Sequence, residues 1–279
     1  MTIKEIIQKS NILLKPHSPT PELDTYLIIE YVTGLNKLDC IMQSELDIPE
    51  NEIDIILGYI QERINHKPIA YILGYKEFYG RIFCVNQHTL IPRPESEAII
   101  DIIKSQSFDT EPVLWEIGTG SGCIAITLAL EIPQAHITAS DISSDTLQVA
   151  KNNDIIISGK RHPISWICSD LLQEFPSNQP DIIVANLPYL DQNIYTDDSL
   201  LYEPDIALYS PDKGLDHYKQ LMTSILSRFI VYPRLLIEIN PEQVPDISTF
   251  IMTAAPYSHI EIYKDIQELD RHLMITLKK

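Results

Sequence analysis

The sequence is short of cysteines and contains no long apolar run. Its four cysteines, Cys40, Cys84, Cys123 and Cys168, form no C-x-x-C pair, so they suggest neither a zinc site nor a disulfide framework. No run approaches the roughly 18 apolar residues that a membrane span needs, and the N-terminus does not resemble a signal peptide. We therefore expect a protein of the cytoplasm that binds no metal and no membrane.

Basic residues are also scarce. Lysine and arginine together number 21 against 39 acidic residues, which gives a formal net charge of −18. Proteins draw most of their affinity for nucleic acids from neutralising phosphates with lysine and arginine, so we expect no direct DNA binding. The acidity also favours solubility, and that explanation is at least as good as any role in steering a partner.

Residues 1–75 show the spacing of apolar residues that is typical of helices, and they predict a small all-helical domain. One helix is expected between Pro49 and Pro68. An earlier helix should begin at Pro21 and end before Gly34. Its apolar stripe is expected to be core and consists of Leu23, Leu27 and Tyr31.

Residues 76–92 predict a β-hairpin that links two domains, because the sequence around Gly80 alternates in character. The prolines of Pro92-Arg93-Pro94 then fix an extended path, and Glu95 and Glu97 open a helix whose N-terminal dipole favours acidic residues. This block is interpreted either as a rigid linker with a helix start or as part of the lining of an active site.

Short β-rich runs alternate with helical segments in residues 93–279. Strands separated by crossover helices predict a parallel sheet with right-handed connections. Five runs belong to this series: 113–117, 136–140, 164–168, 182–186 and 235–239. Two further runs, 259–263 and 274–277, follow each other closely and predict an antiparallel pair at the edge of the sheet.

A glycine-rich turn follows the first of these strands and consists of Gly118, Thr119, Gly120, Ser121 and Gly122. Glycines let the backbone turn sharply and lie close to a ligand, and the helix that follows offers free N–H groups to an anionic group. The G-x-G-x-G spacing is commoner in S-adenosylmethionine sites than in nicotinamide sites.

Acidic residues follow the next two strands. Asp141 can accept hydrogen bonds from both hydroxyls of a ribose, or it can cap the helix that follows. Asp170 can hold an adenine amino group while Leu171 packs on the face of the ring. Ligands of open α/β sheets bind at the carboxyl ends of the strands, so these strand ends together predict a cofactor site.

Asn186-Leu187-Pro188-Tyr189 directly follows the apolar run 181–185 and matches the N-[LP]-P-Y signature of enzymes that methylate a planar nitrogen. A planar NH2, on a carboxamide or an adenine, is a poor nucleophile and must be held by acceptors. The Asn186 side-chain oxygen and the Leu187 carbonyl can be those acceptors. Pro188 stiffens the turn, and Tyr189 can pack against the plane of the substrate. The motif alone does not choose between glutamine and adenine.

With these motifs the chain resembles the peptide chain release factor glutamine N5-methyltransferases over nearly its whole length. Further matching stretches are 68–74, 77–80, 90–97, 141–143 and 202–204. The resemblance implies an α/β fold with a seven-stranded Rossmann-like class I methyltransferase domain at 93–279. A helical substrate-recognition domain at 1–75 and the linking hairpin at 76–92 would precede it.

The resemblance also implies an activity. The chain would transfer a methyl group from S-adenosyl-L-methionine to the side-chain amide nitrogen of the glutamine in the Gly-Gly-Gln loop of release factors, acting as a monomer. Association with the ribosome is left open. Asn186 and the Leu187 carbonyl would hold the glutamine amide. The residues that would hold the cofactor are Gly118, Thr119, Gly120, Ser121, Gly122, Asp141, Asp170, Leu171 and Asn186.

Three stretches depart from the pattern of this family. Leu187 stands where proline is usual, Glu116-Ile117 where Asp-Leu is usual, and Asn240-Pro241 where a glycine is usual. The first two departures also fit ribosomal RNA adenine dimethylases, which are the main alternative. The acidic charge, the Pro92-Arg93-Pro94 block and a helical domain ahead of the sheet argue against them. An inactive relative that only binds termination factors is a second alternative, and the intact loop at 118–122 argues against it.

Overall fold

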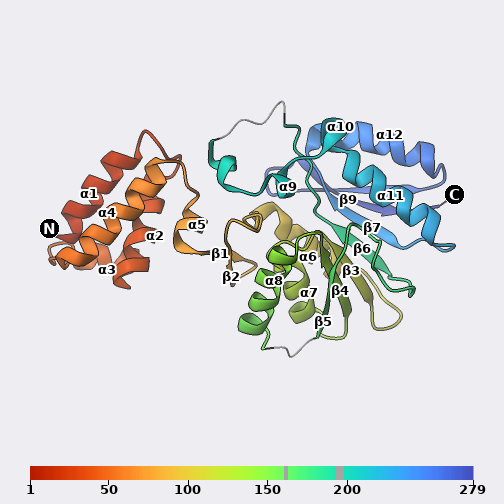
Figure 1. The fold of residues 1–279 in the computed structure, drawn as a ribbon, viewed down its shortest axis with the longest axis horizontal. Helices are drawn as coiled ribbons and strands as arrows, with labels where there is room; N and C mark the ends of the chain where they lie inside the picture. The colour runs from red at the N-terminus through yellow and green to blue at the C-terminus, as the bar shows by residue number, and fades with distance from the viewer. Residues whose placement is uncertain (160–162, 193–197, 279) are drawn as a thin grey trace. The chain divides into compact units, whose positions relative to one another are not determined.

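The computed structural model describes residues 1–159, 163–192 and 198–278. They form two compact units (Figure 1). The first consists of Met1–Tyr75 together with the 3-10 helix η2 (Asp198–Tyr202), and the second contains the rest of the described chain from Lys76 onward. Within the described ranges, every helix is too short or too polar to span a bilayer.

The first unit is helical, as predicted. Its helices are α1 (Ile3–Leu14), α2 (Pro21–Thr33), α3 (Lys37–Met42), α4 (Glu50–Ile64) and α5 (Ile69–Leu73). A capping box between Thr2 and Glu5 begins α1, and Gly34, with φ of 75°, ends α2. Apolar side chains from α1, α2 and α4, such as Ile6, Ile28 and Ile56, form one core between the helices.

The buried face of α2 differs from the predicted one. Leu23 is 56% exposed and Tyr31 is 47% exposed, whereas Ile28 and Ile29 are fully buried. The expected stripe is therefore wrong at those two positions. Apolar residues occur on several sides of this helix, so their spacing does not select one face. The face that turns inward also carries Asp24, whose charge requires a partner inside the unit.

That partner is Arg63 of α4. Its Nε donates to Asp24 Oδ2 at 2.7 Å, and the Ser18 hydroxyl donates to the same oxygen at 2.7 Å. Asp24 is 2% exposed and Arg63 is 9% exposed. Because both charges are largely removed from water, neither is tolerated without the other.

We predict that Asp24→Ala lowers the free energy of unfolding by about 3–5 kcal/mol, because it leaves the Arg63 guanidinium buried without a counter-charge. Urea denaturation of the full chain measures the loss. Glu22→Ala is the matched control, since it removes a carboxylate of the same helix whose partner, Lys37, is exposed, and it should change stability far less. Equal losses in the two variants would contradict the prediction.

The second unit is built on a seven-stranded sheet. Its strands are β3 (Val113–Ile117), β4 (His136–Asp141), β5 (Ile164–Cys168), β6 (Ile182–Ala185), β7 (Arg234–Glu238), β8 (His259–Lys264) and β9 (Asp270–Thr276). Their order is β5-β4-β3-β6-β7-β9-β8, and β9 runs in the direction opposite to the other six strands. The predicted Rossmann-like fold and the antiparallel pair at the edge are confirmed, although β9 begins four residues earlier than expected, at Asp270.

Helices cover both faces of this sheet. Figure 1 shows α6 (Glu97–Lys104), α7 (Cys123–Glu131) and α8 (Ser144–Ile157) on one face, and α11 (Asp216–Arg228) and α12 (Val244–Ala254) on the other. Side chains of a strand alternate between the faces. Leu114 of β3 therefore joins the core under α6 and α7, whereas Trp115 joins the core under α11 and α12.

The predicted hairpin is present as β1 (Tyr75–Phe78) and β2 (Arg81–Cys84). Phe78 and Phe83 are fully buried in the core with α6 and α7, so the hairpin packs as part of the second unit. Asn153 of α8 exchanges two hydrogen bonds with the backbone of Cys84, at 2.9 and 3.0 Å, and donates a third to the carbonyl of Ser121 at 2.9 Å. The hairpin is thereby tied to the glycine loop. A linker role for residues 76–92 stays a prediction.

Short helices complete the second unit. They are η1 (Pro94–Ser96), α9 (Asp205–Leu208), α10 (Pro211–Gly214) and η3 (Pro241–Gln243). β3 and β6 lie side by side, with Ile117 opposite Ala185. The chain continues to β4 on one side of this pair and to β7 on the other. Such a switch point opens a crevice at the carboxyl ends of the strands, where ligands bind.

Candidate active site

A cavity lies at this switch point. Most of the predicted site residues line it: Gly118, Thr119, Gly120, Ser121, Asp141, Asp170, Leu171, Asn186, Leu187 and Pro188. Gly122 and Tyr189 are not among the lining residues. Strand ends that are far apart in the sequence therefore meet around one space, as the sequence predicted.

The glycine loop needs its glycines for two different reasons. Gly118, Gly120 and Gly122 all have positive φ, which side chains disfavour. A Cβ on Gly122 would also lie 3.0 Å from Ile126 and 3.1 Å from Ala150, so this glycine is required by close packing. A Cβ on Gly120 would meet nothing within 4 Å. The backbone at Gly120 is thus open to a ligand.

Asp141 is held by the backbone on both sides. Its Oδ2 accepts from Gly120 N at 3.0 Å, and its Oδ1 accepts from Ser143 N at 3.0 Å. The side chain that caps α8 belongs to Ser143, which accepts from Thr146 N. Burial raises the pKa of Asp141, although the backbone N–H groups oppose this effect. Each carboxylate oxygen keeps a second lone pair for a ligand.

Asp170 and Leu171 follow β5. Asp170 is exposed, and its Oδ2 accepts from Gln173 Nε2 at 3.1 Å. Leu171 has φ of 47°, which is rare for a residue with a side chain. The Ser169 hydroxyl holds this conformation by donating to the Leu171 carbonyl at 3.0 Å. Strained backbone beside a cavity is typical of functional sites.

Leu187 links the turn after β6 to the glycine loop. Its Cδ2 would lie 3.0 Å from a Cβ on Gly118, so its side chain closes over that glycine. The Tyr218 hydroxyl lies 3.3 Å from the Leu187 carbonyl oxygen and closer to the carbonyl oxygen of Glu238. A hydroxyl has one proton to donate. The closer Glu238 carbonyl takes it, and the Leu187 carbonyl remains an available acceptor.

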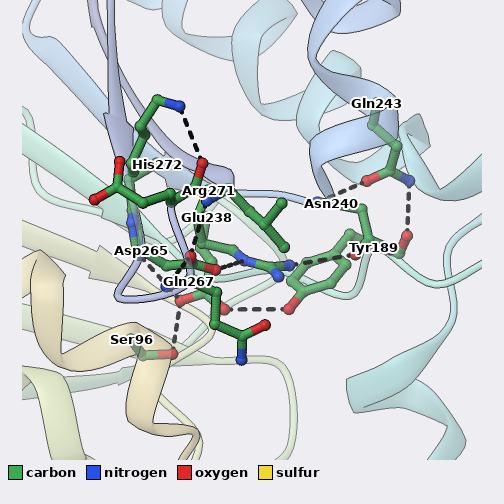
Figure 2. A network of polar contacts seen from close by, with 12 residues as sticks. Ser96, Tyr189, Glu238, Asn240, Gln243, Asp265, Gln267, Arg271 and His272 are labelled. Atoms are coloured by element: carbon green, nitrogen blue, oxygen red, sulfur yellow. Dashed lines mark hydrogen bonds and ion pairs between the residues drawn. The ribbon is translucent and has the colours of Figure 1, made fainter.

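The Asn186 amide is anchored from behind. Its Nδ2 donates to Ser96 Oγ at 3.0 Å, and the Ser96 hydroxyl donates to Glu238 Oε2 at 2.6 Å. The Tyr189 hydroxyl donates to the other oxygen of Glu238 at 3.1 Å (Figure 2). Burial, and then the charge of Glu238, raise the pKa of Tyr189. Its hydroxyl therefore points into this network.

The Pro92-Arg93-Pro94 block contributes to the lining through Pro92 and Arg93. Arg93 Nη2 lies 2.5 Å from Glu203 Oε1, and Ile91 N donates to Glu203 Oε2 at 3.0 Å. Of the two interpretations of this block, the geometry favours the lining of the site. Glu203 holds it in place.

Sequence reasoning did not single out Ser96, Glu238 or Glu116 as site residues. Ser96 lay inside a matching stretch, and Glu238 ends the apolar run of β7. A carboxylate at the end of a buried strand was a visible signal. Glu116, noted only as a departure, lines the cavity and is 2% exposed.

Glu116 has hydrogen-bond donors, and the described residues place no Lys or Arg in an ion pair with it. The Thr119 hydroxyl donates to its Oε2 at 2.6 Å, and Ala125 N donates to the same oxygen at 3.1 Å. Burial raises the pKa of Glu116 to about 8, against the pull of these two donors. The carboxyl therefore keeps its proton through much of the neutral range, and a cationic ligand would favour the ionised form.

We predict that Glu116→Gln becomes the more stable protein as pH rises. The folded-state pKa of Glu116, about 8, lies above the unfolded value of about 4.3. The folded state thus binds the proton more tightly, and the stability that this supplies is complete below about pH 4 and is lost as pH rises through about 8. Glutamine mimics the neutral carboxyl at every pH.

The free energy of unfolding of the natural protein, minus that of Glu116→Gln, should therefore fall by about 1.4 kcal/mol per pH unit between about pH 5 and 8. Urea denaturation at four pH values in this window measures the trend. A constant difference between the two proteins would contradict the raised pKa.

The comparisons with known proteins agree with this geometry. Residues 5–74 match the family model described as "PrmC N-terminal domain", and residues 95–201 match "Methyltransferase small domain". The chain is 34% identical over 268 residues to the "Release factor glutamine methyltransferase" of Neisseria gonorrhoeae. The aligned residues cover 94% of each of the two chains. It is 31% identical over 261 residues to the protein of that name in Bacillus cereus, covering 90% of this chain and 91% of the relative.

Among solved structures, a methyltransferase from Pyrococcus furiosus matches with a TM-score of 0.54 and 15% identity, over 80% of this chain and 97% of that chain. This likeness shows the fold alone. The predicted family is confirmed by the sequence relatives, and the predicted S-adenosyl-L-methionine cofactor by the methyltransferase domain. The chain belongs to the family of release factor glutamine methyltransferases.

Proposed function

We propose that this chain transfers a methyl group from S-adenosyl-L-methionine to the side-chain amide nitrogen of a glutamine in a peptide chain release factor. The observation that carries the proposal is the turn after β6, where the Asn186 amide and the Leu187 carbonyl lie at the cavity next to the glycine loop. The names of the relatives supply the substrate class.

The residues present fit the cofactor. Bound S-adenosyl-L-methionine would supply an electrophilic methyl group on a positively charged sulfonium. Glu116 is a buried carboxyl and Asp141 a partly buried one, and both line the cavity, which suits a cationic ligand. Gly120 leaves its backbone open to close approach, and Leu171 offers an apolar surface beside Asp170 for a flat ring.

The substrate amide needs two acceptors, because a carboxamide NH2 carries two N–H donors. The Asn186 side-chain oxygen would accept one of them and the Leu187 carbonyl the other. Both acceptors stand on a turn fixed to β6 and β7, so the nitrogen would be held in one orientation without further ordering cost. The N–H groups of the amide become more acidic as its nitrogen attacks the methyl carbon, so one proton would be lost without a strong base and positioning would carry most of the rate.

Release factors are the partners that we propose, and the helical unit of Met1–Tyr75 is the part that would recognise them. The acidic net charge of −18 supports a protein substrate over ribosomal RNA. A monomeric state and association with the ribosome stay predictions.

The direct test incubates the protein with S-adenosyl-L-methionine labelled on the methyl group. One reaction contains a purified full-length release factor and a parallel one contains a ribosomal RNA fragment. We expect label only in the peptide that contains the Gly-Gly-Gln loop, located by mass spectrometry. Label in the RNA alone would show the adenine alternative, and label in neither would support an inactive binding partner.

We predict that Asn186→Ala abolishes methyl transfer but leaves cofactor affinity within a few-fold, because its amide mainly holds the substrate nitrogen.

Asp141→Ala should instead weaken cofactor binding by about 1–3 kcal/mol, since it leaves polar groups unpaired. Calorimetric titration with the cofactor and the labelling assay separate the two effects. Full activity in Asn186→Ala, or unchanged cofactor affinity in Asp141→Ala, would overturn the respective assignment.

A further inference from the structure

A buried polar cluster lies behind Asn186. It consists of Ser96, Tyr189, Glu238 and His272, and we call it the Glu238 cluster (Figure 2). Ser96 ends η1, Glu238 ends β7, and His272 belongs to β9. Ser96, Glu238 and His272 are 2%, 1% and 0% exposed. Burying polar groups beside a site is costly, and hydrogen bonds among Ser96, Tyr189 and Glu238 offset part of that cost.

The hydrogen bonds of this cluster run in one direction. The hydroxyls of Ser96 and Tyr189 point at different oxygens of Glu238, at 2.6 and 3.1 Å. His272 Nε2 lies 3.5 Å from Oε2 without a hydrogen bond between them. This is the environment of a carboxylate, which only accepts hydrogen bonds. The single proton of the Ser96 hydroxyl is therefore committed to Glu238.

Ser96 Oγ can then only accept from Asn186. The 3.0 Å contact between them must involve the NH2 group of the amide, as its Nδ2 donates to Ser96 Oγ. The oxygen and nitrogen of a carboxamide have nearly the same shape, so hydrogen bonds decide which way it is turned. With Nδ2 engaged by Ser96, Oδ1 is the end left for the cavity that Asn186 lines.

We propose that Ser96 and Glu238 are positioning residues that fix the Asn186 amide with its oxygen, rather than its nitrogen, toward the substrate. This inference rests on the proposed function. A reversed amide would present NH2 to the NH2 of the substrate, and two donors cannot hold each other. The carboxylate of Glu238 thus sets the polarity of the substrate site through one serine hydroxyl.

The test compares four variants. Glu238→Gln keeps the shape but can donate to Ser96, which would allow the amide to reverse, and Ser96→Ala removes the link. Ser96→Thr keeps the hydroxyl. Ser158→Ala is the matched control, because Ser158 is also 2% exposed and donates to a buried carboxylate, Asp154, but does not line the cavity.

We expect Glu238→Gln and Ser96→Ala to lower kcat on a full-length release factor roughly 10–100-fold, with the cofactor dissociation constant unchanged within about twofold. Ser96→Thr should recover most of the rate, and Ser158→Ala should leave it unchanged. Labelled-methyl kinetics, cofactor titration and melting curves supply the readouts.

The outcomes are separable. Natural protein that labels no glutamine would overturn the proposed function. Active natural protein with Glu238→Gln and Ser96→Ala within twofold of its rate would overturn this inference alone, as would an equal loss in Ser158→Ala.

A measurement on the natural protein covers the case in which these variants do not fold. The side-chain amide signals of Asn186 can be assigned by their loss in Asn186→Ala. Slow exchange of one Nδ2 proton with solvent would support its bond to Ser96, and exchange of both at the rate of a free amide would overturn the inference.

Discussion

The parallel pairing of β3 with β6 is the constraint on which the site depends. It sets Ile117 opposite Ala185, so the glycine loop and the Asn186 turn leave the sheet side by side. Leu187 then closes over Gly118, and the two segments form one surface. A slip of the pairing by one residue would reverse every side chain of β6 and separate the proposed cofactor and substrate sites.

The second constraint is the burial of carboxyls in a chain that already carries a net charge of −18. Glu116 and Glu238 are almost fully buried, and the bonds of both come mainly from hydroxyls and backbone N–H groups rather than from arginine or lysine. The hydroxyl and N–H groups that surround Glu116 and Glu238 therefore donate to these buried carboxyls. At the cavity, the Asn186 side-chain oxygen and the Leu187 carbonyl remain as acceptors for an NH2 substrate, and a cationic cofactor would favour the ionised form of Glu116.

Local patterns were enough to predict the strands, the glycine loop and the Asn186 turn, because each depends on neighbours along the chain. They could not select the buried face of α2, which depends on Arg63, 39 residues beyond Asp24. Nor could they pair Ser96 with Glu238, which are 142 residues apart. Ser96 and Glu238 can each be read in the sequence as a polar residue. Only the fold brings the Ser96 hydroxyl within hydrogen-bond distance of both Glu238 and Asn186.

Leu187, where the family usually has proline, illustrates how such distant contacts replace local ones. A proline would stiffen the turn but would have no N–H. Here the Leu187 N–H donates to the Tyr218 hydroxyl at 3.1 Å, and that hydroxyl donates to the carbonyl of Glu238. The turn is thus fastened through α11 to the end of β7, the strand whose last side chain orients Asn186. Rigidity that a proline ring would supply locally comes instead from the same strand end that holds the amide.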